Sequence, residues 1–132
     1  MNSQIENGEL KIENRDNPLL RKSYDFSLLI VKFVRKIQHE EREFILTKQV
    51  LRSGTAIGAL SEEARQAESK ADFIHKLAIA NKEAHESHYW LRLIKDSGVN
   101  SNSEVDELIG QCSELKKLLI SIIKSAKARK VE

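Results

Sequence analysis

The side chains best suited to chemistry are four histidines: His39, His75, His85 and His88. His85 and His88 are three residues apart, a spacing that brings two imidazoles to one side of a helix. A di-iron bundle needs two Glu-x-x-His motifs and two further glutamates, all directed inward. The residues three positions before His75, His85 and His88 are Asp72, Lys82 and His85, so that motif is missing. We therefore predict solvated histidines and no metal site.

No other pattern predicts catalysis. The single cysteine, Cys112, falls on an apolar helical seam, which predicts a buried and unreactive thiol. Gly54 and Gly58 lack the strand–loop–helix setting of a phosphate-binding loop, and no serine lies in a nucleophile elbow. The sequence predicts a non-enzymatic protein with no catalytic residues and no cofactor. One cysteine and an N-terminus without a signal-peptide pattern favour the cytoplasm.

The clearest charge asymmetry lies near the C-terminus. Six basic residues occur there with no acidic residue between them: Lys116, Lys117, Lys124, Lys127, Arg129 and Lys130. One interpretation is contact with the phosphates of RNA or DNA, and Lys32, Arg35 and Lys36 would extend such a surface. The other is a solvated helix end whose cations are favoured by the helix macrodipole. The chain as a whole has 22 basic and 20 acidic residues, so any nucleic-acid binding depends on a local surface.

Composition and apolar spacing predict the elements that carry these residues. The chain has 132 residues, 40% hydrophobic and 32% charged, with 1 proline and 5 glycines. Those counts exclude a disordered chain and a many-stranded sandwich or barrel, and no apolar run approaches the roughly 18 residues of a membrane span. We predict an all-α, up-down-up-down antiparallel four-helix bundle over residues 23–128, after a polar arm at 1–22 and before a tail at 129–132. The helices are expected at about 24–39, 44–68, 70–97 and 103–127.

Helix ends are indicated by specific residues. Ser23 or Asp25 is the expected N-cap of the first helix, and Ser69 that of the third. Gly98 is well placed to end the third helix. Pro18 is expected in the arm, before the first helix begins.

Two helices carry more apolar surface than one core requires. In segment 70–97, Ile79, Trp90 and Leu93 widen the apolar face, and Lys76 and Glu83 project within it. Leu28 and Val31 lie away from the core face of the first helix. A small bundle with some exposed aliphatic residues is one interpretation. The other is self-association, in which Lys76 and Glu83 pair across helices with Arg52, Glu63 and Glu86 as candidate companions.

Several segments together resemble a known family. They are RSGTAIGA (52–59), EEA (62–64), SKADFIHKLAIA (69–80), KEAHE (82–86) and YWL (89–91). They are similar to the bacterial four-helix-bundle proteins called 23S rRNA-intervening sequence or S23 proteins, over roughly residues 24–125. The resemblance implies an up-down bundle that assembles into a ring, typically a homopentamer, and it brings no catalytic residues. It also implies structural or interface roles for Arg52, Glu63, Lys76, Glu83 and Glu86.

The fold expected from this resemblance is also similar to that of the accessory variability determinant protein of diversity-generating retroelements. That protein forms a basic pentameric barrel that binds nucleic acid and a reverse transcriptase. We therefore expect a non-enzymatic oligomeric binding protein, with RNA or DNA as the leading partner class and no membrane partner. The alternative is a protein–protein scaffold or adaptor without a nucleic-acid role.

Overall fold

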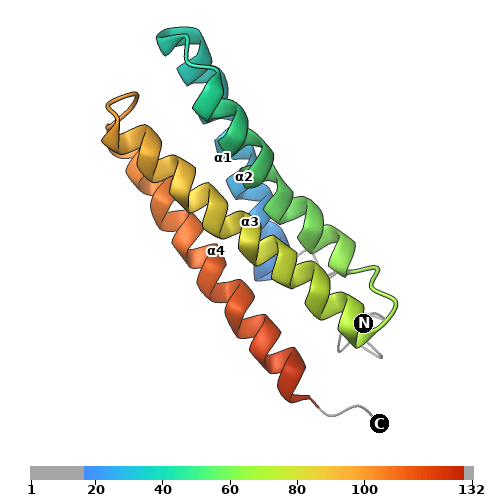
Figure 1. Ribbon diagram of the computed structural model, residues 1–132. Helices are drawn as coiled ribbons and strands as arrows, with labels where there is room; N and C mark the ends of the chain where they lie inside the picture. Colours follow the sequence, from blue (N-terminus) through green and yellow to red (C-terminus); the bar gives the residue numbers. More distant parts are fainter. Residues whose placement is uncertain (1–16, 130–132) are drawn as a thin grey trace.

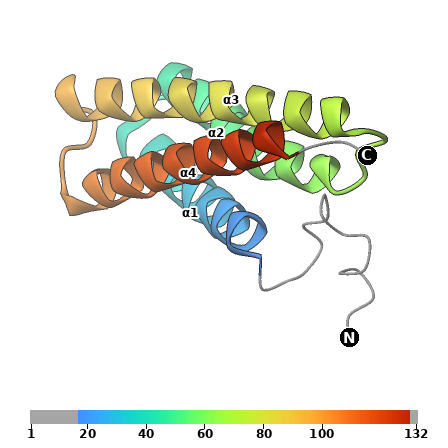
Figure 2. The same cartoon turned by 90° about the horizontal axis from the view of Figure 1, so that it is seen from below.

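The computed structural model describes residues 17–129, which form four α-helices joined by short turns (Figure 1). The helices are α1 (Pro18–Glu41), α2 (Ile45–Ala64), α3 (Lys70–Asp96) and α4 (Ser103–Ala128). Each helix returns alongside the one before it, and α3 and α4 lie side by side in both views (Figures 1 and 2). Residues 17–129 contain no strand. The predicted all-α, four-helix class is therefore confirmed.

The predicted start of the first helix was wrong by about six residues. The N-cap is Asn17, whose side-chain oxygen accepts hydrogen bonds from the backbone N–H groups of Leu19 (2.9 Å) and Leu20 (3.2 Å). Pro18 occupies the first helical position, where a backbone N–H is not needed and the fixed φ favours a helix. Ser23, a predicted N-cap, is instead buried inside α1, as are Leu19 and Leu20. The remainder of the predicted arm, residues 1–16, lies outside the described residues.

The turns follow local capping rules. Arg42 ends α1 with a left-handed backbone (φ 53°). The Glu43 carboxylate then accepts the N–H groups of Ile45 (3.0 Å), Leu46 (2.9 Å) and Thr47 (3.0 Å) at the start of α2. Helix α2 ends at Ala64, four residues before the predicted boundary.

The predicted caps of the third helix are confirmed. The Ser69 hydroxyl accepts the N–H of Asp72 at 3.0 Å, at the start of α3. After α3, Gly98 adopts φ 88°, a conformation that side-chain-bearing residues rarely adopt. These two ends fix the length of α3, which carries His85, His88 and Arg92.

Small residues let α2 approach its neighbours closely. A Cβ added at Gly54 would lie 3.1 Å from Cγ1 of Ile30, and one at Gly58 would lie 3.3 Å from the carbonyl oxygen of Ser23. On the side of α2 that faces α3, Ser53 and Ser87 are fully buried and their hydroxyls hydrogen-bond at 2.8 Å. The glycines and serines of α2 therefore serve helix packing.

The register between α3 and α4 is fixed at three levels. The buried Cys112 thiol donates to the carbonyl oxygen of Ala84 at 3.1 Å, and burial raises the pKa of this thiol to about 12. Lys95 pairs with Asp106 at 2.6 Å near one end, and Lys70 donates to the carbonyl oxygen of Arg129 at the other. The predicted burial of Cys112 is confirmed, and one turn beyond it lies Lys116.

Candidate nucleic-acid interface

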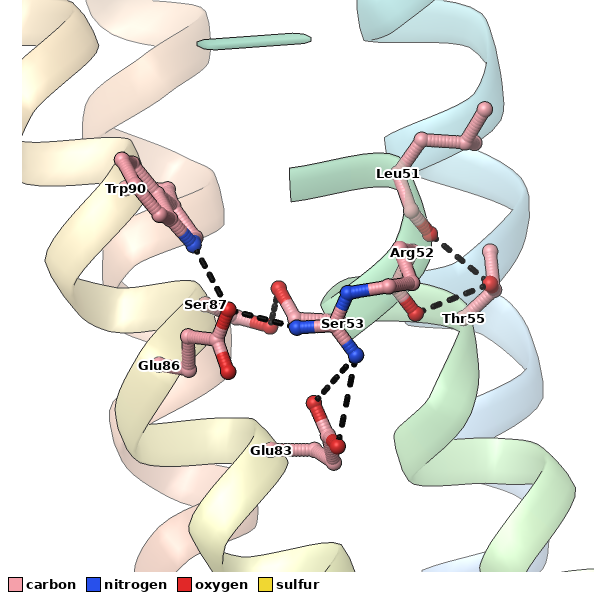
Figure 3. Close-up of polar contacts among 8 residues, drawn as sticks. All are labelled: Leu51, Arg52, Ser53, Thr55, Glu83, Glu86, Ser87 and Trp90. Carbon is pink, nitrogen blue, oxygen red and sulfur yellow. Dashed lines mark hydrogen bonds and ion pairs between the residues drawn. The ribbon is translucent and has the colours of Figure 1, made fainter. Parts of the chain in front are cut away.

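One side of α3, the side against α2, carries a cluster of opposite charges. The Arg52 guanidinium contacts the Glu83 carboxylate at 3.2 Å and the Glu86 carboxylate at 2.5 Å (Figure 3). The Trp90 indole N–H also donates to Glu86, at 2.9 Å. The hydrogen bonds from Trp90 and then Arg52 lower the pKa of Glu86, and the bond to Glu86 raises the pKa of Arg52. Both pKa shifts favour the charged forms of Arg52 and Glu86.

A second ion pair extends this surface toward the start of α3. The Lys76 ammonium lies 3.9 Å from a Glu63 oxygen and 3.8 Å from an Asp72 oxygen. Arg52, Glu63, Lys76, Glu83 and Glu86 are here called the ion-paired face. The sequence predicted that Lys76 and Glu83 pair across helices as part of self-association. Within a single chain, Lys76 already has a partner on α2 (Glu63), and Glu83 is paired with Arg52 of α2. The structure does not bring them to each other: Lys76 contacts Glu63 and Asp72, and Glu83 contacts Arg52.

The apolar residues expected at an oligomer interface do not form one cluster. Ile79, Trp90 and Leu93 are half-buried on α3, and Tyr89 packs edge-on against Trp90 with ring centroids 5.1 Å apart. On α1, Leu28 is 44% exposed and Val31 is half-buried. Other exposed large apolar residues also lie on α1 or just before and at the start of α2, namely Tyr24, Leu29, Phe44 and Ile45. Tyr89 of α3 and Ile120 of α4 are exposed as well, so exposed large apolar residues occur on all four helices, and three of them lie on α1.

On the opposite side of α3, where α4 packs, the surface is lined by cations of α4. Lys116, Lys117, Lys124 and Lys127 fall within roughly 100° of arc on α4 at about 100° per residue. None forms an ion pair with a carboxylate of residues 17–129. Lys117 and Lys124 also line an open surface hollow of about 500 Å³ with Ile120, Ser121 and Ser125. Arg129 follows the last helical residue, and Lys130 lies outside the described residues.

Helix α3 adds three basic side chains that the sequence did not assign to this surface. His85, His88 and Arg92 occupy one stripe of α3, and the Arg92 Nε–H donates to His88 Nδ1 at 3.1 Å. Partial burial and then the charge of Lys116 lower the pKa of His85. The pKa of His88 is lowered by burial, Lys116, Arg92 and His85, in that order. Lys116, Lys117, Lys124 and Lys127 of α4, with His85, His88 and Arg92 of α3, are here called the basic face.

The signal that could have found the α3 residues was present in the sequence. The spacing of His85, His88 and Arg92 places them on one helix stripe. What the sequence could not supply was the register that brings Lys116 beside them. Lys36, expected to extend the basic surface, instead pairs with Glu104 at 3.2 Å on the α1 side of α4.

Comparison with known proteins identifies the family. The family model for 23S rRNA-intervening sequence proteins matches residues 15–121. The chain belongs to this family. A crystal structure from Bacteroides thetaiotaomicron, described as a protein with unknown function from the S23 ribosomal protein family, is 45% identical with a TM-score of 0.79. The similarity covers 80% of this chain and 98% of that chain. No curated protein matches the chain.

The match to 23S rRNA-intervening sequence proteins confirms the resemblance and corrects its extent. The matched region begins before Asn17, in agreement with a first helix that starts at Pro18, whereas the sequence placed the resemblance from about residue 24. It includes Lys116 and Lys117 but ends before Lys124. The similarity to the retroelement accessory protein stays a prediction. Part of the basic face therefore lies beyond the region that defines the family.

Metal-ligand clusters and membrane-spanning helices are two further features that bear on function. Residues 17–129 contain no group of three or more His, Cys, Asp or Glu side chains placed to hold a metal ion. Within the same range, no helix is both long and apolar enough to cross a membrane. Neither finding assigns a partner, and the charged faces of α3 remain the most distinctive surface features.

Proposed function

We propose that this 23S rRNA-intervening sequence protein is a non-enzymatic, homo-oligomeric binding protein that contacts RNA or DNA through its basic face. The supporting observation is the contrast between the two sides of α3. Arg52 and Lys76 are paired with carboxylates on one side, whereas the α4 lysines have no carboxylate partner among the described residues. A row of unpaired cations attracts a phosphate backbone and releases its counterions.

The near-neutral total charge is consistent with this proposal. The chain carries a net charge of +2, but ion pairs neutralise much of the charge on the α2 side of α3 and on the α1 side of α4. Lys22 pairs with Glu114 at 3.8 Å and Lys36 with Glu104 at 3.2 Å, both toward α1. Glu104 and Glu114 are thus directed away from Lys117, Lys124 and Lys127, and Asp106 of α4 is engaged by Lys95. The local positive potential over the basic face exceeds what the net charge suggests.

Binding of a labelled oligouridylate, followed by fluorescence anisotropy over a range of salt concentrations, tests the proposal. The affinity should fall steeply with salt. The triple variant Lys117→Gln, Lys124→Gln, Lys127→Gln should bind more weakly, with a log–log salt slope smaller by about 2, because each single-strand phosphate contact contributes about 0.7. The matched control is Lys32→Gln, Arg35→Gln, Lys48→Gln, which removes three exposed cations from α1 and α2. An equal loss in both variants, or no binding by the wild type, would contradict the proposal.

The oligomeric part of the proposal depends on the exposed apolar surface of α1. A closed ring would bury Tyr24, Leu28 and Val31 and present several basic faces to one nucleic-acid strand, which raises avidity without new contacts. For a pentamer, light scattering should give a mass of about five times the 15.1 kDa of one chain. The double variant Leu28→Glu, Val31→Glu should lower that mass. A wild-type monomer would contradict the ring, and unchanged assembly of the variant would exclude this face.

A protein–protein scaffold is the second candidate function. The observation that favours it is the same exposed surface, where Tyr24 is 61% and Ile45 is 75% exposed. An apolar contact with another protein depends little on salt, whereas phosphate binding weakens strongly. Salt-insensitive binding of a protein partner, with no oligouridylate binding, would favour the scaffold.

A further inference from the structure

We infer that His85, His88, Arg92 and Lys116 form a phosphate site that takes up protons when a nucleic-acid phosphodiester binds. The inference rests on the proposed function and adds both the place of one phosphate contact and its dependence on pH. It concerns the α3 part of the basic face, where two side chains can change their charge near neutral pH.

The site is built from two helices in a fixed register. His85 directly follows Ala84 and His88 lies one turn farther along α3, and the hydrogen bond from Cys112 to Ala84 holds α4 against this part of α3. Lys116 follows Cys112 by one turn on the same side of α4, and its charge acts on both histidines. Arg92 lies one turn beyond His88 and is hydrogen-bonded to it. His85, His88 and Arg92 therefore line one stripe of α3, and the charge of Lys116 reaches the two histidines from α4.

The charges that act on the two histidines are positive, whereas Glu86 beside His85 points toward α2 and Asp96 lies one turn beyond Arg92 on α3. Lys116 faces the histidines from α4, and Arg92 and the neighbouring histidine face them along α3. Helix α2 packs against the other side of α3, where Arg52 is engaged by Glu83 and Glu86, and α1 lies beyond α2 and α4. The ion pair between Lys95 and Asp106 lies farther along the helices. A bound anion would favour the protonated forms of the histidines, which burial and these positive charges disfavour.

The hydrogen bond between Arg92 and His88 links proton uptake to binding. His88 Nδ1 accepts from Arg92 Nε, so this nitrogen carries no proton in the structure. When His88 is protonated, both ring nitrogens become donors and the bond from Arg92 is lost. The guanidinium of Arg92 and the imidazolium of His88 can then both donate hydrogen bonds to the negatively charged oxygens of one phosphate. Protonation converts an internal donor–acceptor pair into two donors for the same ligand.

The sign of the pH effect follows from the charges. A bound phosphodiester stabilises the imidazolium forms, so the pKa of each histidine is higher in the complex than in the free protein. Lowering the pH therefore strengthens binding. Between pH 7.5 and 5.5, we expect the affinity for a labelled oligouridylate at constant salt to increase about tenfold. Neither the phosphodiesters nor the uracil bases of this probe titrate in that interval, so the protons come from the protein side.

The test compares anisotropy titrations at several pH values for three proteins. In the wild type the affinity rises as the pH falls. In His85→Gln, His88→Gln the rise is lost, while salt-sensitive binding at pH 7.5 remains through the α4 lysines. The matched control is His39→Gln, His75→Gln, which removes two exposed histidines from other surfaces and should keep the full pH dependence. The same loss in both double variants would overturn the inference.

Other outcomes separate this inference from the proposed function. Salt-sensitive oligouridylate binding whose affinity does not change with pH would overturn the phosphate site alone. No binding at any pH would overturn both proposals. NMR titration of the histidine ring protons with inorganic phosphate identifies the source of the ligand. We expect the oligouridylate to raise the pKa of His85 and His88 at a much lower total concentration of phosphate groups than inorganic phosphate requires. If inorganic phosphate raised the pKa equally at the same concentration, the assignment to nucleic acid would be overturned.

Discussion

The two sides of α3 use charge in opposite ways. Toward α2, Glu83 and Glu86 engage Arg52, and Glu63 and Asp72 engage Lys76. Toward α4, burial and then the charge of Lys116 disfavour the protonated forms of His85 and His88. The first arrangement pairs each cation with carboxylates, whereas the second leaves the α4 lysines without a carboxylate partner among the described residues. A local excess of positive charge of this kind attracts anions.

The difference between the two sides of α3 also shows why the net charge of this chain does not predict where a phosphate could bind. A total of +2 gives little reason to expect a phosphate-binding surface. The sum conceals the segregation of carboxylates, which lie largely against α2 and α1. The placement of partners, rather than the number of lysines, distinguishes the basic face from the ion-paired face.

The largest expected effect lies beneath the ion-paired face. Ser87→Leu introduces a bulky side chain where α2 and α3 approach closely and leaves the buried Ser53 hydroxyl without its partner. We expect the free energy of unfolding to fall by about 2–3 kcal/mol in urea denaturation. Ser121→Leu, at an exposed position of α4, should change it by less than about 0.5 kcal/mol. Equal effects of the two substitutions would mean that α2 and α3 are not closely packed.

The same substitution on the two faces should give different results. Arg52→Gln removes the contacts to Glu83 and Glu86 and should lower the free energy of unfolding by at most about 1 kcal/mol, because the pair is half-exposed. Lys116→Gln removes only the repulsion between Lys116 and protonated His85 or His88, so the free energy of unfolding should be unchanged or slightly higher. Denaturation at low and high salt checks the comparison, since salt should weaken the effect of Arg52→Gln. A larger loss for Lys116→Gln would reverse the assignment of the faces.

The smallest effect concerns the histidines and pH. The pKa values of His85 and His88 in the folded protein are lowered from 6.5. Between 6.5 and the lowered pKa of each histidine, the unfolded chain therefore binds more protons than the folded protein. Their contribution to stability is therefore fully present above about pH 6.5 and is lost as the pH falls through the lowered values. His85→Gln, His88→Gln should lose less stability than the wild type between pH 7.5 and 5.5.

The role of Lys116 in this pH effect can be measured separately. Lys116→Gln should raise the pKa of both histidines in an NMR titration, because it removes a nearby positive charge. Unchanged histidine pKa values would show that Lys116 does not face them.

Much of the fold could be predicted because helical periodicity and caps are local. The apolar seam of α4, the Ser69 cap and the turn at Gly98 all follow from neighbouring residues. The start of α1 could not, because Pro18 is compatible with either a break or a first helical position, and the choice depends on the Asn17 cap and on the burial of Leu19 and Leu20. Sequence alone was ambiguous at that point.

The candidate site was predictable only in part, for a related reason. The α4 lysines were visible as a run without acids, and Lys76 and Glu83 as charges within an apolar arc. Arg52, Glu63 and Glu86 were indicated as their companions and by the family resemblance. The association of His85, His88 and Arg92 with Lys116 depends on the register between α3 and α4. That register is set by contacts such as Cys112 to Ala84, which join residues 28 positions apart. No local pattern encodes it.

Lysine footprinting of the wild-type protein, with and without bound oligouridylate, tests the central claim most directly. A lysine-acetylating reagent reacts with exposed ammonium groups, and mass spectrometry reports the extent of reaction at each position. We predict that the oligouridylate protects Lys116, Lys117, Lys124 and Lys127 and leaves Lys32, Lys48 and Lys76 unchanged. Protection of Lys32, Lys48 and Lys76 without protection of the α4 lysines would contradict the account.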